Sequence, residues 1–170
     1  MANQPPKLKD PSTAAFLSWL VPGLGQVYQG RLVKGLLLWG ALWGAFFYGL
    51  QLGEWKVVYL QWDRDNRRYA YLCQVFIGAA AVPALVQYML KRSGRGPWWR
   101  GYQAAPDQET LDDLYRQLGR RFEIGTVYTM IAGLLNILVI YDAYAGAAYA
   151  RLEEQEEEAR GAGAKQEASA

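Results

Sequence analysis

The amino-acid sequence predicts an all-α, polytopic helical membrane protein with three to four membrane segments and an amphipathic surface helix. The first observation is that four windows of 18 to 22 residues contain no Asp, Glu, Lys or Arg, although 18 basic and 16 acidic residues occur among the 170. A helix needs about 20 apolar residues to cross a bilayer, whereas a soluble helix of that length carries charge on its outward face. The second observation is that Trp and Tyr residues lie near the window ends, where their amphipathic rings favour the headgroup level.

The first window, 11–30, follows a polar N-terminal segment, 1–12, and predicts an uncleaved membrane segment at about 13–30. Its apolar part is interrupted by Pro22, Gly23 and Gly25, which favour a kink or a break. This segment therefore either spans the bilayer or enters it as a re-entrant or interfacial piece, which is tolerated only where protein covers it.

The other three windows predict membrane segments at about 35–53, 69–90 and 124–148. Pro83 lies inside the third of these and would free the carbonyl of Ala79, so we expect a kink there. All segments together form a single helical membrane domain, which we place at 13–150. The acidic tail that follows, 151–170, is expected to be a solvated helical extension that frays into disorder.

The loop 91–123 carries seven Lys and Arg residues and is assigned to the cytoplasm by the positive-inside rule. If the first window does not cross, the same rule places the N-terminus in the cytoplasm with three crossings, so the loop 31–34 shares a face with the loop 91–123. Within the longer loop, apolar residues recur every three to four positions over 107–122 and predict an amphipathic surface helix. This helix lies either on lipid headgroups or on the protein's own loops.

The composition excludes several kinds of chemistry. There is no histidine, so histidine metal sites, histidine bases and Ser-His-Asp triads are absent. Cys73 is the only cysteine and lies in an apolar stretch, which excludes an internal disulfide and a multi-thiolate zinc site. We therefore predict no catalytic residues, no cofactor and no metal site. The balanced charge gives no indication of a nucleic-acid partner.

The most distinctive motif is Pro-Gly-Leu-Gly-Gln-Val-Tyr-Gln-Gly-Arg-Leu-Val-Lys-Gly at 22–35. It is not a phosphate-binding loop, because no Lys-Ser/Thr pair follows a glycine and no βαβ unit surrounds it. Small residues in a membrane allow helices to approach closely, so the motif predicts a helical hairpin with a polar turn. Its defining residues are Pro22, Gly23, Gly25, Tyr28, Gly30, Arg31, Lys34 and Gly35.

On these residues, the stretch from about 15 to 53 resembles the two-transmembrane domain family, which pairs two short helices through a Pro/Gly-rich segment and a Tyr-x-Gly-Arg turn. With the apolar segments around 81–87 and 123–143, the whole chain resembles a bacterial family of small polytopic membrane proteins whose domain has no known function. The resemblance covers roughly 12–146 and implies location and architecture only. The second half of the chain departs from a plain two-helix domain.

Polar side chains inside the apolar windows are the remaining candidates for function. A seam of interhelical hydrogen bonds, each contributing about 0.6 kcal/mol, explains them, and a polar path for a substrate is the alternative. Thr129, Gly133 and Asn136 share one helix face, whereas Asp142 is expected near the membrane interface. The candidates are Gln26, Gln74, Gln87, Thr129, Asn136 and Asp142.

The sequence thus predicts a multi-pass protein of the bacterial inner membrane that is not an enzyme and serves as a packing or partner-binding module. Its expected partners are the lipid bilayer and a further copy of the chain or another membrane protein. The alternative is a small transporter or channel subunit. A membrane-bound enzyme would require a pocket in the loop 91–123 that holds Asp112 or Asp113 beside Arg95 or Arg100.

Overall fold

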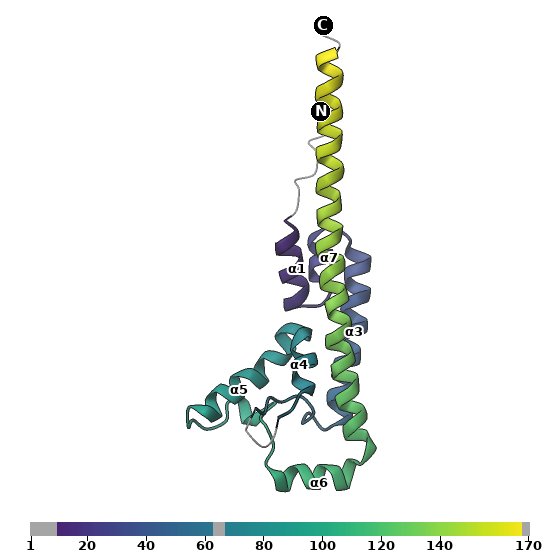
Figure 1. Ribbon diagram of the computed structural model, residues 1–170. Coiled ribbons are helices and arrows are strands. Elements are labelled where there is room, and N and C mark those ends of the chain that lie inside the picture. The colour runs from purple at the N-terminus through teal and green to yellow at the C-terminus, as the bar shows by residue number, and fades with distance from the viewer. Residues whose placement is uncertain (1–9, 63–66, 168–170) are drawn as a thin grey trace.

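The computed structural model describes residues 10–62 and 67–167. Within these residues the chain is all-α and contains no strand, which confirms the predicted fold class. Three helical stretches are long and apolar enough to cross a membrane: Leu32–Leu52, Ala70–Arg92 and Arg120–Tyr149. In chain order the elements are α1 (Pro11–Leu20), α2 (Leu24–Tyr28), α3 (Leu32–Leu52), α4 (Ala70–Gln74), η1 (Val75–Ala81), α5 (Val82–Arg92), η2 (Trp99–Gly101), α6 (Gln108–Leu118) and α7 (Arg120–Glu167) (Figure 1).

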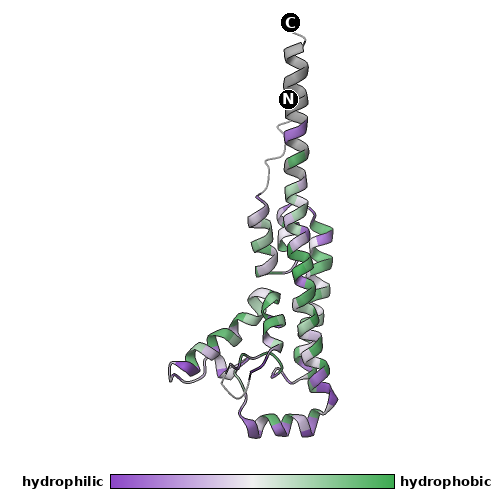
Figure 2. Ribbon diagram, viewed as in Figure 1, coloured by the Kyte–Doolittle hydropathy of each residue, from purple (hydrophilic) through white to green (hydrophobic). Residues whose placement is uncertain are grey.

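Helices α3 and α7 are antiparallel and form the frame of the molecule (Figure 1). Near one end a Cβ atom placed on Gly49 would lie 2.7 Å from the carbonyl oxygen of Gly125, so the two backbones touch. Near the other end Lys34 Nζ lies 2.6 Å from Asp142 Oδ1. Hydrophobic residues cover the length between these contacts (Figure 2). Seventeen residues of helix, about 26 Å, separate the two contacts along α7, which is close to the thickness of a bilayer core.

The first apolar window forms a helical hairpin. The Asp10 side chain caps α1 by accepting a hydrogen bond from the backbone N–H of Thr13, and α1 ends after 10 residues, about 15 Å, at Leu20. Pro22 and Gly23 (φ 84°) then turn the chain into the short helix α2, which returns alongside α1. The chain therefore reverses within this window and forms two short helices, not one continuous helix long enough to cross a membrane.

The third apolar window also reverses direction. Gly78 has non-helical dihedral angles (φ 79°, ψ −128°) and breaks the stretch between α4 and α5. The Tyr71 hydroxyl donates a hydrogen bond to the Ala81 carbonyl at 2.9 Å, whereas residues ten apart in a straight helix are about 15 Å apart. Helix α5 then leads away from α7 (Figure 1). The stretch Ala70–Arg92 is therefore long enough to cross a membrane but is folded as a second hairpin.

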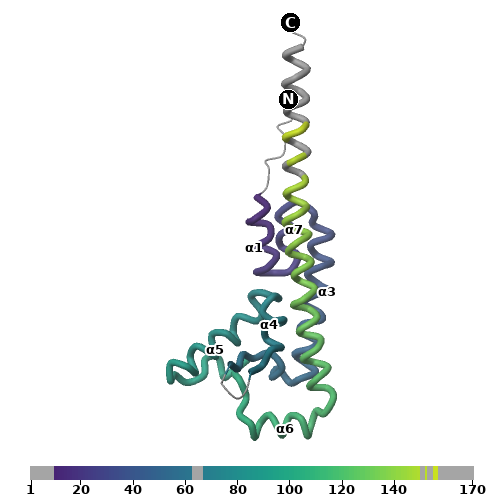
Figure 3. The backbone as a smooth tube through the Cα atoms, viewed as in Figure 1, coloured from purple at the N-terminus to yellow at the C-terminus, as the bar shows by residue number. Residues whose placement is uncertain are grey.

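The turns of the two hairpins meet halfway along α3 and α7. A Cβ atom on Gly78 would overlap the carbonyl oxygen of Trp19 and lie 2.8 Å from that of Leu20. The backbone trace shows α1 ending directly opposite the turn that follows α4 (Figure 3). The hairpins extend from opposite ends of the α3–α7 pair toward its middle. Together they cover the same side of α7 that one continuous helix would cover.

These two hairpins correct two expectations. The break in the third window is at Gly78 and not at Pro83, because Pro83 occupies the first turn of α5, where a missing backbone N–H costs nothing. The loop 31–34 lies at the Asp142 end of α7, whereas the loop 91–123 leads into its opposite end at Arg120. The two loops therefore lie at opposite ends of the α3–α7 pair and do not share the face expected for them, because the third window turns back at Gly78.

The surface helix forms as expected, and the tail extends α7. Helix α6 forms as predicted and is capped by Asp107, whose pKa is lowered by its hydrogen bonds to Thr110. Its apolar face packs on the protein, because Leu114 is buried in the core cluster that includes Phe122. The tail continues α7 as a helix to Glu167, which agrees with the helical extension expected there, and residues 168–170 lie outside the described residues. The N-terminal polar segment 1–12 also falls mostly outside them.

Substitution of Gly78 by alanine tests the contact between the hairpins. A side chain at φ 79° costs about 1–2 kcal/mol, and its overlap with the Trp19 carbonyl adds to this, so we expect Gly78→Ala to lower the free energy of unfolding by at least about 2 kcal/mol. Thermal unfolding of the purified protein in detergent measures the change. Gly40→Ala is the matched control, because no atom lies within 4 Å of a Cβ at Gly40. Equal melting temperatures for the two variants would contradict the contact.

Candidate functional site

The glycines of the 22–35 motif allow α2 to press directly against α3. A Cβ atom on Gly23 would overlap the carbonyl oxygen of Gly35, and one on Gly35 would lie 2.6 Å from the carbonyl oxygen of Gly23. A Cβ on Gly25 would overlap the Ala14 carbonyl of α1. Gly30 has open space around it and is required for its positive φ of 86° at the turn. The motif is thus a three-helix packing element, as its small residues indicated.

The polar residues of the motif gather around one carboxylate on α7. Asp142 Oδ1 accepts a hydrogen bond from Lys34 Nζ at 2.6 Å, and Asp142 Oδ2 lies 4.0 Å from Arg31 and accepts from Gln26 Nε2 at 3.1 Å. The Gln29 amide reaches the Ala143 carbonyl in the next turn. Asp142 is about one-third exposed. It therefore ties the polar turn of the first hairpin to α7 at one edge of the apolar layer.

Gln26 leads from this edge into the interior. Its side chain is fully buried, donates to the Val139 carbonyl at 2.9 Å and accepts from the Ser18 hydroxyl at 3.1 Å. The same hydroxyl accepts a hydrogen bond from the backbone N–H of Gly25 at 3.2 Å. These bonds join α1, α2 and α7 without leaving an amide nitrogen of Gln26 unpaired.

Asn136 lies where the two hairpins meet. Its Nδ2 donates to the Ser18 carbonyl near the end of α1 at 3.1 Å and to the Phe76 carbonyl in η1 at 2.8 Å. Both carbonyls belong to helical turns that are cut short, so neither has a full set of partners along its own helix. Asn136 is fully buried, and its Oδ1 has no partner among the described residues. One side chain of α7 thus supports both broken helices.

Gln74 and Thr129 join the second hairpin to α7. Gln74 Nε2 donates to Thr129 Oγ1 at 2.8 Å and to the Val57 carbonyl at 3.2 Å. Between Thr129 and Asn136 on the same face, a Cβ on Gly133 would overlap the Cys73 carbonyl. The predicted face of α7 is therefore the surface on which α4 packs. Gln74 Oε1 has no partner among the described residues.

Gln87 does not join this group. It lies on α5 and holds the loop that follows, because its Nε2 donates to the Trp98 and Tyr102 carbonyls and its Oε1 accepts from the Trp98 backbone N–H. The structure thus brings five of the six polar candidates together along one side of α7 and leaves Gln87 apart. We call this group of five residues the α7 seam. The α7 seam consists of Gln26, Gln74, Thr129, Asn136 and Asp142.

Two further polar residues were missed in the sequence. Gln103 is 1% exposed, donates to the Ala80 carbonyl at 2.8 Å and accepts from the Ala84 backbone N–H at 3.0 Å, so it braces the turn of the second hairpin. Arg68 lies over the Tyr59 ring, 4.1 Å from its centroid, and donates to Val57 and Thr126. Both lie in loops rich in polar residues, where no sequence periodicity distinguishes a buried polar side chain from an exposed one.

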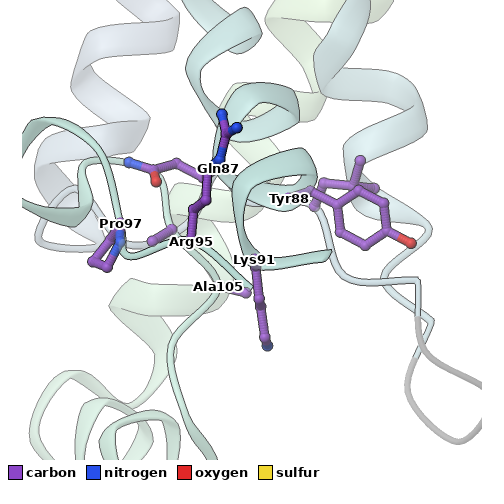
Figure 4. A pocket seen from close by; sticks show the side chains of 8 residues that line it. Gln87, Tyr88, Lys91, Arg95, Pro97 and Ala105 are labelled. Atoms are coloured by element: carbon purple, nitrogen blue, oxygen red, sulfur yellow. The ribbon is translucent and has the colours of Figure 1, made fainter. Parts of the chain in front are cut away.

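The cavities near the charged loop do not contain a catalytic pair. A cavity of about 220 Å³ between α5 and the following loop includes Gln87, Lys91 and Arg95 in its lining (Figure 4). Lys91 and Arg95 point away from each other in this view, so they do not form one anion site. Neither this cavity nor the one beside Arg100 is lined by Asp112 or Asp113. The arrangement required for the enzyme interpretation is therefore not found at these two places.

The chemistry of the α7 seam is that of hydrogen-bond satisfaction. In a bilayer each unpaired backbone carbonyl costs several kcal/mol, and re-entrant segments are stable only where protein supplies partners. Each amide nitrogen of the seam donates to at least one backbone carbonyl of a neighbouring element. The seam therefore makes two broken helices possible inside an apolar layer.

A double-mutant cycle tests the carboxylate end of the seam. Because Asp142 and Lys34 are both partly exposed, we expect Asp142→Asn and Lys34→Gln to couple by about 1 kcal/mol in the free energy of unfolding. Unfolding in detergent at low ionic strength gives this value. The pair Asp142 and Lys56 serves as the control, because Lys56 follows the far end of α3 and should couple by less than about 0.3 kcal/mol. Equal coupling for the two pairs would contradict a specific contact.

Comparisons with known proteins place the chain in a family. Neither the search of the curated proteins nor the search of the solved structures gives a significant match. The family described as a family of unknown function (DUF6677) matches residues 13–156, which include both hairpins, α3, α6 and the membrane portion of α7. Because this match covers most of the chain, the protein belongs to the DUF6677 family of unknown function.

Proposed function

We propose that this protein is a non-enzymatic, multi-pass module of the bacterial inner membrane that packs with partners inside the bilayer. The observation that supports this most strongly is that the α7 seam is used for hydrogen bonds between the elements of the protein. Its buried amides donate to the backbone of α1, η1, α7 and the loop after α3, and its members lie outside the cavities beside α5. A seam whose amide nitrogens all donate to neighbouring elements supports a structural role.

The charge distribution supports the inner membrane and an orientation in it. Eleven of the 18 Lys and Arg residues fall in the segments 53–69 and 91–123. Both segments adjoin the α6 end of the α3–α7 pair. By the positive-inside rule this end faces the cytoplasm, and the 22–35 motif then faces the opposite side. The start of α1 lies at the motif's end of the α3–α7 pair, so this orientation replaces the cytoplasmic N-terminus expected for three crossings.

The outward faces of α3 and α7 support a partner within the bilayer. Gly40 and Gly44 of α3 are exposed, and no atom lies within 4 Å of a Cβ at either position. A small-x-x-x-small pair on a lipid-facing helix allows another helix to approach closely. A further copy of the chain or another membrane protein is the partner that fits this face. The resemblance to the two-transmembrane domain family over 15–53 agrees with a packing role for this part.

A small transporter or channel subunit is the second candidate, because one observation favours it. Discontinuous helices that meet near the middle of a bilayer form the substrate sites of many transporters. Here the two hairpins meet at Asn136, and two buried oxygens beside them, Asn136 Oδ1 and Gln74 Oε1, have no partner among the described residues. An opening of the seam would expose these oxygens to a polar solute.

Asn136→Leu separates the two functions. In the packing role the substitution leaves the Ser18 and Phe76 carbonyls without their donor, so we expect the free energy of unfolding to fall by about 2–3 kcal/mol. Permeability of liposomes containing the wild-type protein to water, glycerol, protons and K⁺ should equal that of protein-free liposomes. Stopped-flow light scattering and ion-sensitive dyes measure it.

Gln51→Leu is the control for this experiment, because Gln51 is an exposed amide on α3. It should change neither stability nor permeability. Wild-type liposomes that pass one of these solutes, and lose this flux in Asn136→Leu but not in Gln51→Leu, would overturn the packing role in favour of transport.

A further inference from the structure

An apolar groove separates α3 from the second hairpin. Helix α5 leans away from α3 and α7, and the space that this leaves forms a cavity of about 570 Å³ (Figure 1). One wall consists of Trp43 and Phe47 of α3, and the other of Ala79, Ala80 and Pro83, whose small side chains leave it open. The volume lies within the roughly 300–1,000 Å³ of ligand-binding pockets.

The groove covers one half of the membrane. Trp43 lies at the middle of α3, and Trp55 lies just past the end of α3 on the α6 side. From Trp43 to the end of the helix at Leu52 the rise is about 14 Å, which is half of a hydrocarbon core of about 30 Å. The groove therefore has the length of an acyl chain of one leaflet.

A continuous row of aromatic rings follows the groove to its outer end. The ring centroids are 5.3 Å apart for Trp43 and Phe47, 6.3 Å for Phe47 and Trp55, and 6.3 Å for Trp55 and Tyr102. Trp99 continues the row at 5.2 Å from Tyr102. Trp and Tyr favour the headgroup level of a bilayer, so the outer end of the groove has the chemistry of that level.

One unpaired cation lies at this outer end. Arg100 is the only charged residue in the lining, is exposed, and makes no ion pair with any described residue. Trp99 and Arg100 both have positive φ (48° and 55°), a backbone conformation that side chains rarely adopt and that is found at binding sites. The Gln87 bonds to Trp98 and Tyr102 hold this loop in place on either side. The strained turn presents a guanidinium next to an apolar channel.

We propose that this groove binds an anionic phospholipid, whose acyl chain lies along Trp43 and Phe47 and whose phosphate pairs with Arg100. The inference deepens the proposed function, because it names a lipid partner for a packing module. An apolar channel of one leaflet's length with a single cation at its headgroup end is complementary to such a lipid. A hydrophobic peptide would need no cation there, and free phosphate would need no channel.

Quenching of tryptophan fluorescence by brominated lipids tests the site on the full-length protein. The protein is reconstituted in bilayers in which acyl-brominated phosphatidylglycerol or acyl-brominated phosphatidylcholine is mixed with unbrominated phosphatidylcholine. We expect phosphatidylglycerol to bind the groove about fivefold more tightly, which is the effect of one cation near an anionic headgroup. Arg100→Gln should abolish this preference, whereas Arg92→Gln, an exposed cation of α5 outside the lining, should retain it.

A groove-filling variant tests the acyl-chain part independently. Ala79 is an exposed residue of the lining, so Ala79→Leu should fold and reduce quenching by both brominated lipids. Glycerol 3-phosphate should not relieve quenching in any variant.

Four results would overturn the lipid site: equal quenching by the two lipids in the wild type, selectivity retained in Arg100→Gln, unchanged quenching in Ala79→Leu, or relief by glycerol 3-phosphate. If the lipid site fails in this way but liposomes with the wild-type protein remain impermeable, the packing role still holds. Failure of the lipid site is therefore distinguishable from failure of the proposed function.

Discussion

The structure depends on the need of every backbone carbonyl in an apolar layer for a donor within the protein. Two hairpins break their helices inside that layer, and α7 supplies the missing donors. Asn136 alone bonds to the Ser18 and Phe76 carbonyls, one from each hairpin. Glycines at the same level, Gly78 and Gly133, let the backbones come close enough for these bonds to form. Polar side chains and small residues on α7 therefore act together.

The fold class and the contact residues could be predicted from the sequence, but the path of the third segment could not. Charge-free windows and the spacing of Thr129, Gly133 and Asn136 are local patterns, and the structure uses that face of α7 for packing. The reversal at Gly78 depends on the Trp19 carbonyl, about 60 residues away, and glycine is common in membrane helices. Length and hydropathy alone therefore predict a crossing where a hairpin forms.

Residues of the α7 seam could also be predicted from the sequence, but their partners could not. Asp142 stands out as an acid between uncharged residues, but its partners Lys34 and Arg31 become visible only when α3 and α7 are placed antiparallel. The same arrangement sends α5 away from α7 and leaves the groove that ends at Arg100. The hairpin that closes the interior along α7 thus opens a lipid-sized space on its other side. The packing along α7 and the proposed lipid site thus both follow from the break at Gly78.

The most direct test is to determine on which side of the membrane each end of the third segment lies. In a Cys73→Ser background, Tyr69→Cys and Arg92→Cys introduce single exposed thiols at these ends. A membrane-impermeant maleimide is applied to right-side-out and inside-out vesicles. The hairpin predicts that both thiols react from the same side, which under the proposed orientation is the cytoplasmic one. Reaction of the two thiols from opposite sides would show a continuous crossing and contradict the account.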